Sequence, residues 1–262
     1  MLPGNLFRLQ LASAFSDRRQ TLLRLGASIL LAFPFLLIRM PARVQATGIT
    51  MIILFTSFFG AAVSHAHLRI DGRLTRLSLL PTSRWVLWLD LILSSVMMRL
   101  GSSGIVLGAF VVANSGHVTA AILLNLAGLL CVALVLLTLL GMGTGRLARS
   151  NAEVHLFGAL ATGMLAMLSG VAPLPVETQG PGALHAWSAA ITAWNPIAWL
   201  LTALNRLALG STAIPRLEFT LSCLALGTVV VGAVLRWRSG GMQKGSFNAR
   251  DIVIGDRAPM EV

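Results

Sequence analysis

The chain has 262 residues, of which 56% are hydrophobic and 11% charged, and its formal net charge is +11. A soluble domain usually carries about a quarter charged residues, so this composition excludes a globule whose whole surface faces water. The cations lie mostly in short segments between apolar runs, where the charge rule of membrane proteins explains them better than binding to nucleic acid does. The two cysteines, Cys131 and Cys223, lie inside apolar runs and indicate neither a disulfide nor a metal site.

Apolar runs separated by polar segments predict an all-α polytopic membrane protein, with residues 1–262 forming a single transmembrane domain. A chain of this length has room for about six spans of roughly 20 residues each. The expected spans are residues 22–38, 47–66, 85–113, 118–145, 154–172 and 217–237.

The polar segments beside these spans have distinct patterns. Residues 1–21 combine spaced apolar positions with arginines, which is typical of an interfacial helix lying on the membrane surface; an unstructured basic leader is the alternative. Residues 67–84 form a cationic segment after the second span. Residues 173–216 contain prolines and tryptophans and predict half-inserted, re-entrant helices on the outer side before the last span. Residues 238–262 form a polar tail.

The distribution of Lys and Arg predicts the orientation of the chain. With the N-terminus inside, most of these residues fall on the inner side, and the outer side holds only Arg39, Arg43, Arg206 and Arg216. This asymmetry requires an even number of spans. Both termini are therefore expected in the cytoplasm, with the chain in the inner or plasma membrane of the cell.

The sequence offers no pattern for catalysis or for a metal site. Residues 141–146 are rich in glycine but lack the spacing of a phosphate-binding loop, and small residues in a helix favour close helix packing instead. His65 and His67 point to different faces of a helix, with no carboxylate or cysteine beside them. Few ionisable residues lie within the spans, which disfavours a membrane-embedded hydrolase.

Arg99 is a cation inside an expected span, and Asp90 lies about 13 Å away along the same helix. The two are too far apart to pair directly. An arginine in the hydrocarbon costs at least ~2.5 kcal/mol unless it faces protein or water. Two interpretations fit: Arg99 lines a wet cavity or contacts substrate, or it pairs with a carboxylate or a helix-end carbonyl elsewhere.

Residues 67–84 carry the most specific pattern in the chain. Ile70, Leu74 and Leu77 recur at helical spacing as an apolar stripe. A basic stripe of Arg69, Arg73 and Arg76 recurs beside it at the same spacing, and Pro81 ends the helix. The pattern predicts a short two-faced helix under the membrane, which either rests on the membrane surface or docks onto a cytoplasmic protein.

This segment resembles the short cytoplasmic helix of ABC-2 type transporter permeases, where a pattern like E-R-E-x-G-T-L-E-x-L-x-x-x-P-x-S-R-W leads from the second span into the third. The matching residues are Gly72, Leu74, Leu77, Pro81, Ser83, Arg84 and Trp85. A second stretch resembles the family's N-P-x-x-[YW]-L-L…G pattern, and its residues are Asn195, Pro196, Trp199, Leu200, Leu201 and Gly210. Ile70 and Thr75 stand where the family has acids, Asp71 lies one position away, and Arg206 follows the usual arginine by one position.

The resemblance implies a permease subunit that dimerises with a second, identical or similar permease and is driven by two cytoplasmic ABC ATPase subunits. ATP and Mg would bind to the ATPases, and this chain would bind no cofactor of its own. The implied docking and coupling residues are Arg69, Asp71, Gly72, Arg73, Leu74, Arg76, Leu77 and Pro81. The expected substrate pathway includes Arg99, Phe55 and Phe59, and the expected outer gate includes Asn195, Pro196 and Trp199.

The expected function is export of an amphipathic or apolar cargo such as a drug, a peptide or a lipid. A polysaccharide channel usually offers stacking aromatic residues, and this chain has no tyrosine. A polysaccharide or glycolipid exporter is one alternative. An ATP-independent channel or secondary transporter is another, although the inverted repeats typical of many secondary transporters are not visible. A non-transporting membrane anchor or sensor subunit is a third.

Overall fold

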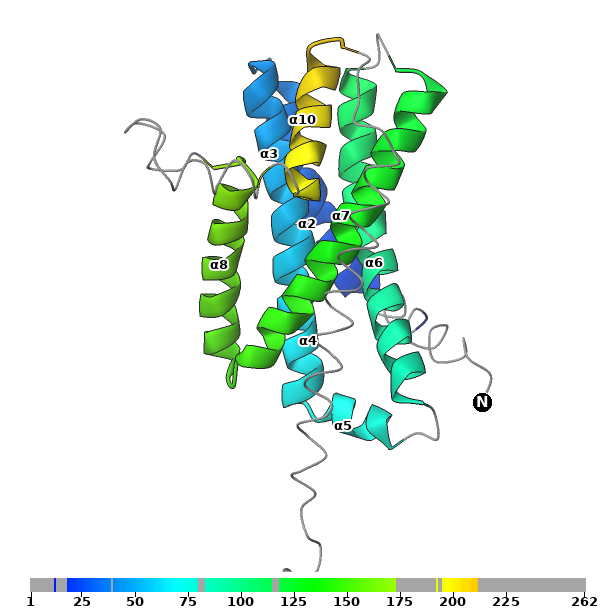
Figure 1. Cartoon of the computed structure of the whole chain (residues 1–262), viewed down its shortest axis with the longest axis vertical. Helices are drawn as coiled ribbons and strands as arrows, with labels where there is room; N and C mark the ends of the chain where they lie inside the picture. The colour runs from blue at the N-terminus through cyan, green and yellow to red at the C-terminus, as the bar shows by residue number, and fades with distance from the viewer. Residues whose placement is uncertain are drawn as a thin grey trace, which may run out of the picture. The chain divides into compact units, whose positions relative to one another are not determined.

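The computed structural model describes residues 12, 18–38, 40–79, 83–114, 118–172, 192 and 195–211. The chain divides into two compact units, Met1–Leu224 and Ala225–Val262, and every described residue belongs to the first unit. The described part is 87% helical and contains no strand, which confirms the all-α prediction. Its main elements (Figure 1) are α2 (Arg18–Leu37), α3 (Ala42–Leu54), the π-helix η1 (Phe55–Phe59), α4 (Gly60–Ile70), α5 (Arg73–Ser78), α6 (Arg84–Ala113), α7 (Ala120–Leu147), α8 (Asn151–Leu168) and α10 (Pro196–Ala208).

Three of the described helices are long and apolar enough to cross a membrane: Ala42–Ile70, which runs through α3, η1 and α4; Val86–Ala113 in α6; and Ala120–Leu147, which is α7. A helix of 28 residues is about 42 Å long, longer than the ~30 Å hydrocarbon core of a bilayer. The chain is therefore a membrane protein. These helices coincide with the second, third and fourth predicted spans.

The total of six spans stays a prediction. The first and fifth predicted spans fall on α2, which contains a shorter apolar stretch at Gly26–Leu37, and on α8. The sixth span and the polar tail lie outside the described residues, as do nearly all of residues 1–17 and most of residues 173–216.

Side-chain caps correct the predicted helix boundaries. Ser and Thr hydroxyls accept backbone N–H groups in the first turns of three helices: Ser83 from Val86 in α6, Thr119 from Ile122 in α7, and Ser150 from Glu153 in α8. The fourth helix consequently covers 120–147 instead of 118–145. The fifth covers 151–168 instead of 154–172, because Gly170 takes a left-handed conformation with φ of 68° and ends the helix.

The second helix is longer than predicted at both ends, covering 42–70 instead of 47–66. It begins directly after Pro41, whose carbonyl accepts the N–H groups of Val44 and Gln45 in the first turn. The polar Gln45 in its first turn is satisfied, because its side-chain amide donates to the Phe35 carbonyl of α2 at 2.8 Å. The helix continues to Ile70 and stops where Gly72 turns the chain.

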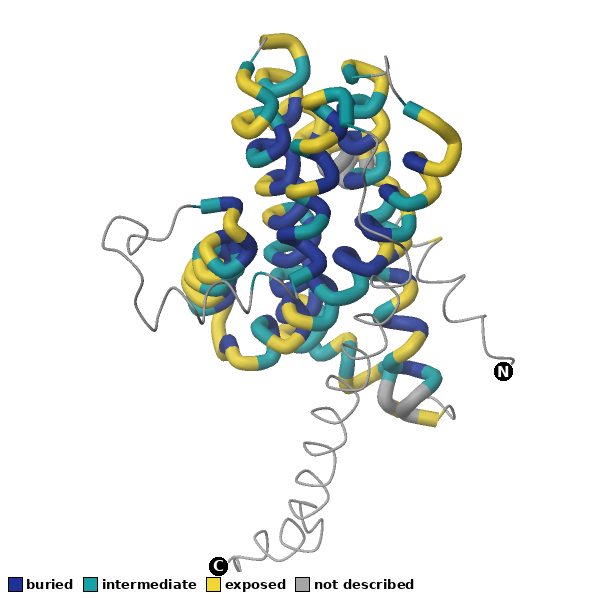
Figure 2. Tube along the Cα trace, turned by 45° about the horizontal axis from the view of Figure 1, so that its top comes forward, coloured by how far each residue is buried: buried dark blue, intermediate teal, exposed yellow. Residues whose placement is uncertain are grey.

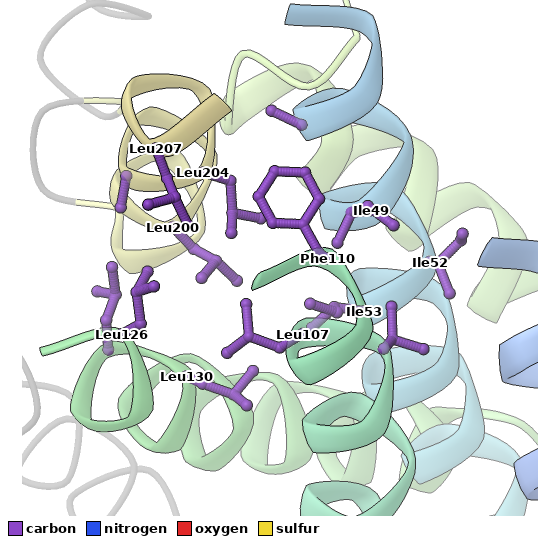
Figure 3. Close-up of a cluster of buried hydrophobic side chains, with 14 of the residues drawn as sticks. Ile49, Ile52, Ile53, Leu107, Phe110, Leu126, Leu130, Leu200, Leu204 and Leu207 are labelled. Carbon is purple, nitrogen blue, oxygen red and sulfur yellow. The ribbon is translucent and has the colours of Figure 1, made fainter. Parts of the chain in front are cut away.

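The largest buried cluster lies where α3, α6, α7 and α10 meet (Figures 2 and 3). Its labelled side chains in Figure 3 are Ile49, Ile52, Ile53, Leu107, Phe110, Leu126, Leu130, Leu200, Leu204 and Leu207. Such contacts hold membrane helices together mainly by close packing, since lipid tails are as apolar as leucine. The cluster fixes α10 against α3 and α7.

α4 and α7 approach each other most closely at two glycines of α7. A Cβ atom at Gly141 would lie closer than 3.0 Å to the Phe58 carbonyl oxygen and to the Ala61 Cβ, and one at Gly145 would lie equally close to the Ala62 carbonyl oxygen. Gly143 lies between them and has open space around it. The interpretation of residues 141–146 as a helix-packing segment is confirmed.

Candidate functional site

The short helix α5 joins the end of α4 to the beginning of α6, at the bottom of Figure 1. Gly72 makes this connection possible, because its φ of 67° is a left-handed conformation that other residues rarely adopt. The two-faced helix predicted from Arg69 to Leu77 is therefore broken at Gly72. Arg69 and Ile70 belong to α4, and a new helix begins at Arg73.

The two faces of α5 have different surroundings. Leu74 and Leu77 are half-buried and pack against Leu87 and Leu91 of α6. Ile70 does not join them, since 41% of its surface is exposed. The predicted apolar stripe thus holds α5 to α6 through two leucines.

The opposite side of α5 is charged and open. Arg73 and Arg76 are exposed, as is Asp71 in the preceding turn. Leu79, directly after the helix, is 80% exposed. Pro81 lies outside the described residues. This basic surface with two flanking apolar residues, Ile70 and Leu79, is the candidate docking surface.

A polar cluster next to α5 connects α4, α6 and α7. The Arg69 guanidinium donates to the backbone carbonyl of Arg146 at the end of α7, where helix carbonyls lack partners of their own. The Arg146 guanidinium lies 4.0 Å from the centre of the Trp88 ring of α6, a cation–π contact. The buried His65 ring lies beside the same ring, with the centroids 5.6 Å apart. These contacts join the three membrane helices α4, α6 and α7 to one another.

Arg99 is buried, with 8% of its surface exposed, and contacts backbone carbonyls. Its Nε donates to the Ser57 carbonyl of η1 at 2.8 Å, and its Nη1 donates to the Ser95 carbonyl of its own helix at 2.7 Å. Both carbonyls lie within helices rather than at a helix end. A place for Arg99 in the substrate pathway stays a prediction. Asp90 is also buried, and its Oδ2 has no hydrogen-bond partner in the part of the chain that the structure describes.

Phe55 and Phe59 stack on each other at the π-helix, with ring centroids 4.8 Å apart. Phe59 extends toward α8, where its ring lies 5.7 Å from the His155 ring and fills the space beside Gly158. Phe55 is 42% exposed. Phe55 is therefore partly accessible while Phe59 packs against α8, and the role of the pair in a substrate pathway stays a prediction.

The Asn195-Pro196 pair begins α10 and also attaches it to α8. The Asn195 Oδ1 accepts the Ile197 N–H at 3.0 Å, which caps α10, while Nδ2 donates to the Ser169 hydroxyl at 2.9 Å. Pro196 occupies the first turn and is buried, and Trp199 packs partly buried against the main cluster. These three residues lie near the end of α8 remote from α5, and an outer gate built from them stays a prediction.

Replacing Asn195 should separate its two roles. Asn195→Asp keeps the acceptor that caps α10 but loses the donor to Ser169, so we expect it to destabilise the protein by about 1 kcal/mol. Asn195→Ala loses both bonds and should cost about 1 kcal/mol more. Thermal unfolding of the purified variants, followed by tryptophan fluorescence, measures both effects. Equal melting temperatures for the three proteins would contradict the attachment of α10 to α8.

Sequence reasoning missed Ser57, Trp88 and Arg146 as members of these clusters. Trp88 and Arg146 have ordinary local signals, an aromatic residue near a membrane boundary and a cation in the last turn of a helix. Neither signal says which partner each one meets. Ser57 has no local signal, because its importance comes from a π-turn that the sequence does not reveal.

Comparison with known proteins finds no match: no protein-family model, no curated protein and no solved structure matches the chain. The resemblance to ABC-2 permeases rests on the residues of its two motifs. What it implies about function is therefore a proposal.

Proposed function

We propose that the chain is the membrane-spanning permease subunit of an ATP-driven ABC exporter. The observation that carries this proposal is α5, a six-residue helix whose arginines are exposed and whose leucines are packed onto the base of α6. Because α5 is packed onto α6 in this way, a partner that displaces α5 would displace the base of α6 with it. In this proposal a separate ATPase supplies the energy, in keeping with a sequence that does not carry the spacing of a phosphate-binding loop.

α5 is connected directly to two of the membrane helices, so a partner that moves α5 would move them too. α5 is continuous with α4 through Gly72, and it packs on α6 through Leu74 and Leu77. The contact of Arg146 with Trp88 and the close packing of Gly141 on α4 include α7 in the same movement. In the proposed cycle, ATP closes the pair of ATPases, and their closing moves α5 together with these three helices.

The charge of the candidate docking surface indicates the chemistry of its partner. Arg73 and Arg76 are exposed on α5, and Asp71 is the acid beside them among the described residues of this surface. A complementary acidic groove on the ATPase would orient the two proteins and speed their association. The exposed Ile70 and Leu79 would provide the apolar contacts at the edges of the groove.

The rest of the proposed assembly is what the resemblance of the two motifs to ABC-2 permeases implies. Six spans with both termini in the cytoplasm would form half of a permease dimer in the cell membrane, with an identical or similar subunit as the other half. Two ATPase subunits would bind ATP and Mg. An amphipathic or apolar cargo would pass between the two permeases, beside Phe55 and Phe59, and leave at an outer gate near Asn195, Pro196 and Trp199.

The proposed orientation predicts which residues a membrane-impermeant maleimide reaches in intact cells. In a chain whose two cysteines are replaced by serine, Leu209→Cys at the end of α10 should be labelled from outside. Leu79→Cys should be labelled only after the membrane is permeabilised. Both side chains are well exposed, at 69% and 80%, so burial does not explain a difference. Labelling of Leu79→Cys in intact cells would place α5 outside and contradict a cytoplasmic partner.

The proposed function is tested by purifying the tagged full-length chain from membranes in a mild detergent and identifying the proteins that accompany it. We expect a stoichiometric ATP-binding protein, and ATP hydrolysis by the complex. A folded chain that is purified without any ATP-binding protein, under conditions that keep membrane complexes together, would contradict the proposal. That outcome would favour an ATP-independent channel or secondary transporter.

A further inference from the structure

A π-turn interrupts the long helix Ala42–Ile70 near its middle. Residues Phe55–Phe59 form η1, with regular α-helix before and after them. A π-turn changes the pairing of backbone groups in a helix and is frequent at functional positions. Here the Gly60 N–H bonds to the Ser57 carbonyl. The Ser57 carbonyl thus takes part in the backbone hydrogen bonding of the π-turn.

Two side chains of α6 hold Ser57 at this position. Arg99 donates through Nε to the Ser57 carbonyl at 2.8 Å, and the Ser103 hydroxyl lies 3.3 Å from the Ser57 hydroxyl. Arg99 and Ser103 are one helical turn apart on the same face of α6. Ser57 and Ser103 are almost completely inaccessible to solvent, and Arg99 is nearly so. Both the main chain and the side chain of Ser57 are thus fixed to α6.

An arginine at position 99 carries a free-energy cost that an apolar residue would not. Burying a cation among membrane helices costs several kcal/mol unless its hydrogen bonds compensate, and an apolar side chain of similar volume would avoid that cost. The guanidinium is held in place from its own helix, because Nη1 donates to the Ser95 carbonyl. The Arg99 guanidinium is therefore a rigid hydrogen-bond donor that bridges α6 and η1.

The same two helices are also joined at α5. The chain passes from η1 through α4 and α5 into α6, and Leu74 and Leu77 attach α5 to α6. This loop of helices is closed at one end by the leucines and at the other by Arg99 and Ser103. Because α4, α5 and the adjoining half of α6 are joined at both ends, they can move as one rigid body, with η1 as its pivot.

We propose that Arg99 is a positioning residue that locks the π-turn of η1 against α6. The lock fixes the pivot of the unit formed by α4, α5 and the adjoining half of α6. Its use in ATP-driven motion rests on the proposed function, whereas the lock itself is a property of the chain alone. Arg99 acts through the backbone of Ser57 and does not need to touch cargo.

The lock is tested by hydrogen–deuterium exchange of the purified full-length chain in lipid nanodiscs, without any ATPase. Arg99→Met should speed amide exchange in peptides covering residues 55–60 by about tenfold or more, since a hydrogen bond from a charged donor is lost. Ser102→Ala is the matched control, because the hydrogen bond that the Ser102 hydroxyl makes among the described residues stays within α6, to the Arg99 carbonyl. It should leave exchange at residues 55–60 unchanged. Arg99→Lys keeps one charged donor and should lie between Arg99→Met and the native protein.

A covalent replacement for the lock completes the test. In a background without the native cysteines, Ser57→Cys with Ser103→Cys should form a disulfide that restores slow exchange to Arg99→Met, and reduction should abolish the rescue. If Arg99→Met does not yield folded protein, Arg99→Lys takes its place in both measurements. Unchanged exchange at residues 55–60, or a uniform increase that includes α7 and resists the disulfide, would overturn the proposal. Because no ATPase is present, this result is independent of whether one is purified with the chain.

Discussion

Gly141→Leu is expected to prevent the chain from accumulating as a folded protein. A Cβ atom added at this position would lie within 3.0 Å of the Phe58 carbonyl oxygen and the Ala61 Cβ. The backbone of η1, which carries the Phe58 carbonyl, cannot move aside as a flexible side chain would, so η1 and α4 must separate from α7. Overpacking of this kind costs about 3 kcal/mol, a large share of the stability of a typical protein.

Gly143→Leu is the matched control for this prediction. Gly143 lies on α7 between the two contact glycines, is exposed, and has no atom within 4 Å of a Cβ position. Leucine is a better helix former than glycine by roughly 0.5–1 kcal/mol, so this variant should be at least as stable as the native protein. Yield and melting temperature in detergent measure both variants. A Gly141→Leu protein that melts at the native temperature would contradict the close approach of α4 and α7.

Arg73→Glu with Arg76→Glu is expected to abolish association with the ATPase while leaving the fold intact. Both side chains are exposed on α5, so their replacement removes no buried contact. Reversing two charges opposite an acidic groove places like charges together, which costs several kcal/mol and weakens binding about a hundredfold or more. The amount of ATPase purified with the chain, normalised to folded permease, measures the effect.

Arg43→Glu is the corresponding control at the other end of the chain's membrane helices. It reverses one charge, half the change of the double variant, at an exposed residue in the first turn of α3, far from α5 in Figure 1. It should retain the full amount of ATPase. Native association should also weaken as salt is raised, because exposed charges are screened within about 10 Å at 0.1 M salt. Equal loss in both variants would mean that charge reversal acts on the protein as a whole rather than on a docking surface.

Patterns of composition and period predicted much of the fold. The long apolar runs identified the second, third and fourth helices, because membrane helices need length and apolarity above all. The spacing of leucines and arginines indicated a short two-faced helix, and α5 has that form, although the predicted helix did not include the break at Gly72. The glycines near residue 141 indicated close helix packing, which the structure confirms.

Other features depend on contacts between distant residues and could not be predicted. The π-turn at Phe55–Phe59 has no sequence signal, and the partner of Arg99 could not be identified without it. The helix boundaries at Ser150 and Gly170 depended on a cap and a left-handed residue that were not weighed against the apolar runs. Asn195 carried a motif match, but its bond to Ser169 joins two helices whose relative position only the structure gives.

A photo-crosslinking residue at Leu79, used in intact membranes, tests the central claim most directly. Leu79 is 80% exposed beside the arginines of α5, so a partner seated on the docking surface must lie within its reach. The account predicts a single dominant crosslink to an ATP-binding protein, which is lost when Arg73 and Arg76 are changed to glutamate. The same residue at Leu124, exposed near the start of α7, should not capture that protein. Crosslinks at Leu79 to lipid alone, in membranes where the chain is folded, would contradict the assignment of α5 as the site where an ATPase drives this permease.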